Sequence, residues 1–141
     1  MSTEQNKTLV RRFGDLINAQ NLDGAFALFT ADFVDHGLPP GAPSGVESSR
    51  QFFKARFAAF PDLYATLTDI IAEGDRVASR MHIDGTHQGS LMGIPPTGKH
   101  VQWSFISIHR IADGKIAEHW TEMDTLGLMQ QLGVVPPPRG A

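Results

Sequence analysis

The hydrophobic residues of this chain change their period at Pro61, and that change constrains the fold more than any other feature of the sequence. Before it, apolar side chains recur at helical spacing over residues 3–20 and 45–59, with a shorter helix expected between residues 22 and 29. After it, apolar and polar residues alternate, which predicts four strands, at residues 63–72, 76–86, 99–111 and 115–123. Helices followed by a run of strands are typical of an α+β fold, with helices packed on an antiparallel sheet.

A turn and a capping signal organise the end of the chain. Asp113-Gly114 separates the last two predicted strands, and an Asp-Gly pair between strands is typical of a β-hairpin. Asp124 is placed to cap a short helix over residues 125–132, and Gly133 is placed to end it. The last two strands should therefore pair antiparallel, with a helix directly after them.

The composition narrows the class of protein. A length of 141 residues fits one domain, which we assign to residues 1–135, followed by a Pro-rich tail over residues 136–141. The lack of cysteine excludes disulfide bonds and thiolate metal sites, and it suits the cytoplasm, where we expect the protein. The net charge of -3 carries no block of like charge, and no apolar stretch has the length of a membrane span. We therefore expect neither nucleic acid nor a membrane as a partner.

The sequence also lacks the residue spacings that are typical of metal-binding and nucleotide-binding motifs. Its six histidines do not recur as metal-ligand motifs, and the glycine-rich segment 88–98 lacks the Lys-Ser/Thr of a phosphate-binding loop. We therefore expect no metal and no nucleotide cofactor.

Six short motifs occur in order along the chain, at Asp32–His36, Ala59–Leu63, Gly74–Val77, Gly85–Gly89, Gly93–Lys99 and Arg110–Trp120. Together they resemble the SnoaL-like polyketide cyclases, also called the ester cyclase family, of the NTF2-like superfamily. The resemblance implies a cone, in which N-terminal helices pack on a strongly curved antiparallel sheet that encloses a pocket, and usually a homodimer packed sheet to sheet. The namesake enzymes close a ring by intramolecular aldol chemistry on a polyketide ester, without a metal or an organic cofactor.

The same resemblance implies two catalytic positions. Family members use an acidic side chain on the last strand, assisted by a histidine on the preceding strand. Here these positions fall on Thr121 and Ser107. A threonine hydroxyl cannot act as a general base near neutral pH as a carboxylate does, so other groups would have to supply the base.

Two residues are candidates for that base, and a third is a candidate for ligand binding. His119 shares a strand face with Thr121 and is either a general base or a structural, hydrogen-bonded histidine. Asp124 follows the Thr121 position by three residues, at the end of the strand, and is either a relocated catalytic carboxylate or the helix cap. His36 lies on the segment that usually crosses the mouth of the cone, and we expect it to line the pocket as a hydrogen-bond donor.

Trp103, Phe105 and Ser107 share one face of a strand and are either the walls of the pocket or ordinary core. Two functions remain open. One is a cofactor-independent cyclase, isomerase or lyase that acts on a small, mostly apolar carbonyl compound. The other is a non-catalytic protein of the same fold that binds a small molecule. We expect a homodimer through the opposite sheet face, because Ile106, Ile108 and Trp120 would otherwise form an exposed apolar patch there.

Overall fold

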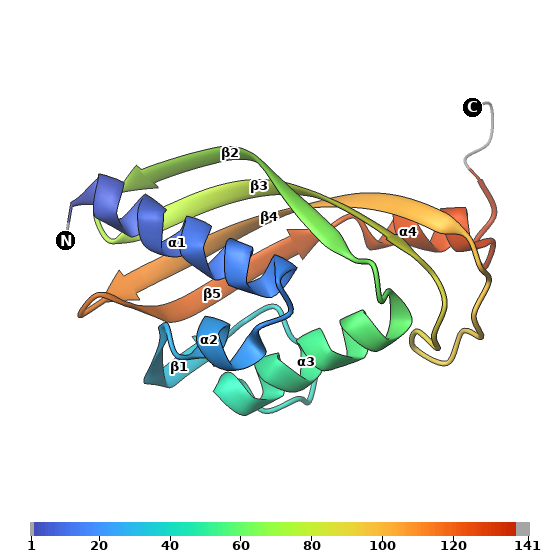
Figure 1. The fold of residues 1–141 in the computed structure, drawn as a ribbon, viewed down its shortest axis with the longest axis horizontal. Coiled ribbons are helices and arrows are strands. Elements are labelled where there is room, and N and C mark those ends of the chain that lie inside the picture. The colour runs from blue at the N-terminus through green and yellow to red at the C-terminus, as the bar shows by residue number, and fades with distance from the viewer. Residues whose placement is uncertain (1, 138–141) are drawn as a thin grey trace.

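Four helices and five strands form the described part of the chain, residues 2–137 of a computed structural model (Figure 1). In chain order they are α1 (Thr3–Asn18), α2 (Leu22–Phe26), β1 (Phe29–Asp35), α3 (Val46–Ala59), β2 (Tyr64–Glu73), β3 (Arg76–Thr86), β4 (His100–Ala112), β5 (Lys115–Met123) and α4 (Thr125–Leu132). The α+β class and the four predicted strands are confirmed. Most of the predicted tail, residues 138–141, lies outside the described residues.

The five strands form one curved sheet in the order β1-β5-β4-β3-β2 (Figure 1). Strands β2 to β5 form an antiparallel meander, as the turns predict, but β1 pairs with β5 in parallel. The expectation of a wholly antiparallel sheet is therefore wrong at this edge. The reason is that no hairpin joins β1 to β5, so no tight turn sets their relative direction.

The register of the β4–β5 hairpin decides which side chains share a face. Ser107 lies opposite Thr121, and His109 lies opposite His119. A register shift between Arg110 and Ile111 leaves the extra residue on β5 before His119. The shift therefore does not disturb the alternation from His119 onward, and both pairs stay on one side of the sheet.

Two apolar clusters pack the helices against the sheet. The first joins Phe13 of α1 to the aromatic side chains of α2 and β1, with Phe29 and Phe33 only 4.4 Å apart between ring centroids. The second lies near the end of α3, where Phe60 packs on Trp103 with 5.1 Å between ring centroids. Leu128 of α4 is fully buried in this second cluster. The two clusters hold the helices in place along the concave side of the sheet.

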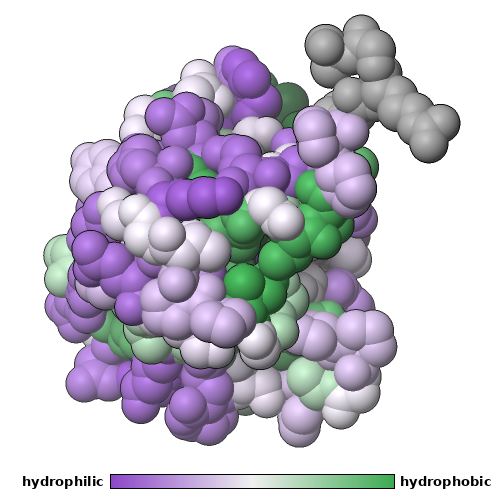
Figure 2. Space-filling model, turned by 90° about the vertical axis from the view of Figure 1, so that its right-hand side faces the viewer, coloured by the Kyte–Doolittle hydropathy of each residue, from purple (hydrophilic) through white to green (hydrophobic). Residues whose placement is uncertain are grey.

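The surface at the end of the molecule that carries α4 is mixed in polarity. Figure 2 shows a band of hydrophobic side chains there within a mostly hydrophilic surface. Leu126 in α4 and Val134 just after it are among the exposed apolar residues of the chain. Residues 2–137 contain no helix that is long and apolar enough to cross a membrane.

Candidate functional site

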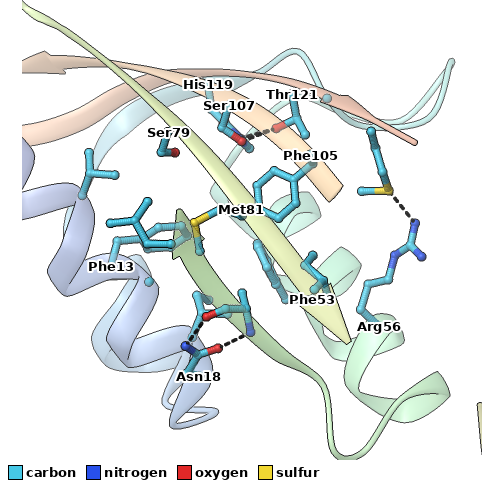
Figure 3. Close-up of a pocket in the computed structure, with 18 of the residues that line it drawn as sticks. Phe13, Asn18, Phe53, Arg56, Ser79, Met81, Phe105, Ser107, His119 and Thr121 are labelled. Carbon is cyan, nitrogen blue, oxygen red and sulfur yellow. Dashed lines mark hydrogen bonds between the residues drawn. The ribbon is translucent and has the colours of Figure 1, made fainter. Parts of the chain in front are cut away.

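A cavity of about 350 Å³ lies between the helices α1 and α3 and the sheet (Figure 3). Most of its lining is apolar, including Phe13, Phe53, Met81 and Ile83. Its volume is within the range of pockets that hold small molecules, and such pockets combine apolar walls with a few placed polar groups. The polar groups here include Asp35, Arg56, Ser107, His119 and Thr121.

Five of the residues expected in the pocket do line this cavity. Trp103 and Phe105 contribute aromatic walls from β4, and Ser107, His119 and Thr121 contribute polar groups from β4 and β5. Strand alternation explains the arrangement, because residues 103, 105 and 107 share one face of β4. The antiparallel register then brings residues 119 and 121 to the same side of the sheet.

Three polar atoms meet at the cavity wall. The Nε2 atom of His119 lies 2.5 Å from Oγ1 of Thr121 and 3.3 Å from Oγ of Ser107. The two hydroxyl groups lie 3.1 Å from each other. One imidazole nitrogen therefore faces the cavity together with two hydroxyl groups, which can donate a hydrogen bond or accept one.

Asp35 faces the other nitrogen of the same imidazole, with its Oδ1 atom 3.4 Å from Nδ1 of His119. The carboxylate is buried and accepts hydrogen bonds from the Ser49 hydroxyl at 2.6 Å and from the Gly37 backbone N–H at 2.8 Å. Burial acts to raise the pKa of Asp35, but the contacts with His119, Ser49 and Gly37 outweigh it and hold the pKa below its ordinary value. The carboxyl group is therefore ionised at neutral pH.

The contact between Asp35 and His119 depends on the parallel pairing of β1 with β5, which places these two residues opposite each other. Asp35 is not among the site residues that the sequence predicts. The pairing of two strands far apart in the sequence leaves no local pattern that would have revealed this contact.

His109 is a second histidine in the cavity lining, and it is almost wholly buried. Burial, and next the nearby His119, lower the pKa of His109 well below its ordinary value. Neither of its ring nitrogens has a hydrogen-bond partner within residues 2–137. The ring is therefore neutral at neutral pH. In the part of the chain that the structure describes, no three His, Asp or Glu side chains are grouped so that they could hold a metal ion.

His36 does not line the cavity, so its predicted place is wrong. Its ring stacks on Trp120 with 5.0 Å between ring centroids, and its Nε2 atom lies 2.7 Å from Oε2 of Glu118. Successive residues of an extended segment point to opposite sides. Because Asp35 faces the cavity, His36 faces the other side of the sheet.

Asp124, a candidate for the relocated catalytic carboxylate, does not line the cavity either, although its neighbour Met123 does. The Asp124 side chain is exposed and accepts a hydrogen bond from the backbone N–H of Gly127 at 2.9 Å. This is the geometry of a helix N-cap, here for α4. The helix starts one residue after β5, so the Asp124 side chain is turned toward the first turn of the helix.

The comparisons with known proteins identify the family and agree with the fold. The family model of the SnoaL-like polyketide cyclase matches residues 7–132. The chain is 32% identical to the aklanonic acid methyl ester cyclase DauD from Streptomyces sp. strain C5, over 94% of this chain and 84% of the relative. It is 28% identical to the cyclase DnrD of the same description from Streptomyces peucetius, over 99% of this chain and 98% of the relative.

Solved structures show the same likeness. AclR, a putative hydroxylase from Streptomyces galilaeus, superposes with a TM-score of 0.89 at 31% identity, over 99% of this chain and 87% of AclR. IdmH, a putative polyketide cyclase from Streptomyces antibioticus, superposes with a TM-score of 0.82 at 34% identity, over 92% of this chain and 99% of IdmH. Proteins with two different described activities thus share this fold.

Proposed function

Because the chain belongs to the SnoaL-like polyketide cyclase family, we propose that it closes a ring by intramolecular aldol addition in a small, mostly apolar carbonyl compound. The observation that carries this proposal is the pairing of Asp35 with His119 at the wall of an apolar cavity. A carboxylate that holds one imidazole nitrogen orients the ring and makes the other nitrogen a better base. This pair would supply the base that Thr121 cannot.

The proposed reaction begins with proton transfer. Nδ1 of His119 faces the Asp35 carboxylate, so this nitrogen carries the ring proton and Nε2 is free to accept another. When substrate binds, the Thr121 hydroxyl turns from Nε2 toward the substrate carbonyl oxygen. Nε2 then removes a proton from the carbon next to that carbonyl, and the electron pair of the C–H bond forms an enolate.

Ring closure follows from the enolate. The Ser107 and Thr121 hydroxyls donate hydrogen bonds to the enolate oxygen, where negative charge develops. The enolate carbon attacks a second carbonyl of the same molecule, and the new C–C bond leaves an alkoxide. The alkoxide takes the proton from Nε2 of His119, which restores the neutral imidazole. No atom is lost, and no oxidant or reductant is consumed.

The first step can be tested without knowing the substrate. We would follow the exchange of the carbon-bound protons next to the carbonyl of 2-tetralone, a small apolar ketone, in D₂O by NMR. The wild-type protein should accelerate the exchange, and His119→Ala or Asp35→Asn should slow it about 100-fold or more. His36→Ala is the matched control, because this histidine lies outside the cavity.

Ring closure itself is tested with two methyl esters. That of aklanonic acid is named for the two relatives above, and that of nogalonic acid is named for a third relative, from Streptomyces nogalater. A cyclised product of unchanged mass, formed by the wild type and not by His119→Ala, would support the proposal. Exchange that is equally fast in the wild type and His119→Ala would contradict the mechanism. Binding of these compounds with neither exchange nor cyclisation would favour the non-catalytic binding protein.

A further inference from the structure

Arg56 places a positive charge in the cavity wall, opposite the polar groups of the sheet. Figure 3 shows this side chain on the α3 side of the cavity, with Ser107, His119 and Thr121 on the sheet side. Arg56 forms no ion pair with any residue that the structure describes, and its Nη1 atom is buried without a hydrogen-bond partner there. The chemistry proposed above gives this cation no role.

The neighbours of Arg56 do not neutralise its charge. The guanidinium lies over the Phe52 ring, 5.0 Å from the ring centroid, and Nη2 contacts the Met123 sulfur at 3.9 Å. A ring face and a thioether are weak partners for a cation compared with a carboxylate. Burial lowers the pKa of Arg56 below its ordinary value, as expected for a cation removed from water without a counter-ion.

The position of Arg56 also suits contact with a ligand. A second hollow, of about 270 Å³, adjoins the cavity and shares Gly37, Leu38, Phe52, Arg56, Thr121 and Met123 with it. Glu122 lines this hollow but forms no ion pair with Arg56. Arg56 therefore lines both spaces, and its guanidinium group adjoins the space that a ligand in the cavity would occupy.

We propose that Arg56 binds an anionic oxygen of the ligand, so that the ligand is an apolar carbonyl compound that carries one carboxylate or phenolate group. A guanidinium recognises such oxygens through paired N–H donors and gains strength when water is excluded. A singly charged group fits better than a phosphate, because Arg56 is the only arginine or lysine of the described chain that lines both the cavity and the hollow, whereas Arg11, the other arginine of the cavity lining, is exposed on α1. The proposal rests on the proposed function only in placing the reacting carbonyl at His119.

The test is a binding measurement with matched probes. Calorimetry would compare 2-naphthoate with 2-naphthamide, which has the same shape without the charge. A second pair compares 4-nitrophenol with 4-nitroanisole, which cannot ionise. Binding of 4-nitrophenol would be followed by absorbance, because its ionised form is coloured, and binding of 4-nitroanisole by calorimetry. We expect the wild type to prefer a charged probe by about tenfold or more, and a preference in only one pair would identify a carboxylate or a phenolate as the group.

Variants assign that preference to one side chain. Arg56→Met keeps the length of the side chain and should remove the preference, with little change for the uncharged probes. Arg56→Lys keeps the charge and should retain part of it. Arg12→Met is the matched control, because Arg12 is exposed on α1 and does not line the cavity. Thermal melting of each variant shows that it is folded.

Two outcomes would overturn the proposal. One is a wild type that binds charged and uncharged probes equally or binds none of the four. The other is a charge preference that survives in Arg56→Met. Failure of the catalytic mechanism gives a different result, since His119→Ala should keep the preference for the charged probe. A wild type that does not accelerate proton exchange but still prefers the charged probe would refute only the proposed reaction.

Discussion

The imidazole rings of His109 and His119 stack face to face, with 4.7 Å between ring centroids and 6° between ring planes. His109 is neutral because it is buried, so a proton on His119 would not meet a charged neighbour on that side. On its other side His119 faces the ionised Asp35. The stack therefore fixes the plane of the His119 ring while the carboxylate sets its charge environment.

Burial of His109 predicts a loss of stability on mild acidification. Its pKa in the folded protein lies well below the ordinary value of 6.5 that applies to the unfolded chain. At a pH below 6.5, and above the pKa of the folded protein, His109 binds a proton in the unfolded chain but not in the folded protein. The contribution is therefore fully present above pH 6.5 and falls with decreasing pH, by up to about 1.4 kcal/mol per pH unit.

The variant His109→Phe should reduce this loss. A phenyl ring keeps the stack on His119 and the edge contact with Phe13, but it does not titrate. We would measure the free energy of unfolding by urea at pH 7 and pH 5 for both proteins. An equal loss in both proteins would show that His109 is not the responsible group.

Asp35 predicts a further loss of stability, at lower pH than the loss that His109 causes. Its folded pKa is lowered from an ordinary value of 3.8, so its stabilising effect is present above that value and is lost as the pH falls through the folded pKa. Asp35→Asn should therefore destabilise the protein at pH 7 by on the order of 1–3 kcal/mol, and the difference should shrink near pH 3. Denaturation by urea at pH 7 and at pH 3 measures the free energy of unfolding of both proteins. Ser49→Ala removes one hydrogen bond to the same carboxylate and should cost less, so a larger cost for Ser49→Ala would contradict this account.

The cap of α4 predicts a change in stability without a change in activity. Asp124→Ala removes the hydrogen bond to Gly127 and should lower the free energy of unfolding by about 1 kcal/mol, whereas Asp124→Asn should keep most of it. Neither variant should change the exchange rate of 2-tetralone, because Asp124 does not line the cavity. If Asp124→Asn slowed the exchange as much as His119→Ala does, that result would show that Asp124 takes part in catalysis.

The outer face of the sheet predicts association. Ile106 and Ile108 on β4 are 52% and 38% exposed, and Trp120 pairs with Ile108 on the neighbouring strand. We expect two 15.4 kDa chains to associate through this face, as the family resemblance implies. Sedimentation at micromolar concentration should show a dimer that the double change Ile106→Glu and Ile108→Glu separates. Leu126→Glu, at an exposed site on α4, should not separate it, and a monomeric wild type would contradict the expectation.

The sequence by itself determined the helices, the strands β2 to β5 and the faces of the central strands. The turn at Asp113-Gly114, where both residues have positive φ values of 52° and 73°, sets the antiparallel direction of β4 and β5. Alternation along those strands then places Phe105, Ser107 and Thr121 on the same side of the sheet. These relationships are predictable because they depend on residues that are close together in the chain.

Only the tertiary structure decided which groups surround His119 and line the cavity. Alternation shows that Asp35 and His36 face opposite sides, but the parallel pairing of β1 with β5 decides that Asp35 faces the cavity. Arg56 likewise reaches the cavity because of how α3 lies on the sheet, which its helical spacing alone does not specify. Such contacts depend on the register and packing of segments far apart in the sequence. Local periodicity and turn chemistry carry no information about that register, and the packing of the whole core settles it.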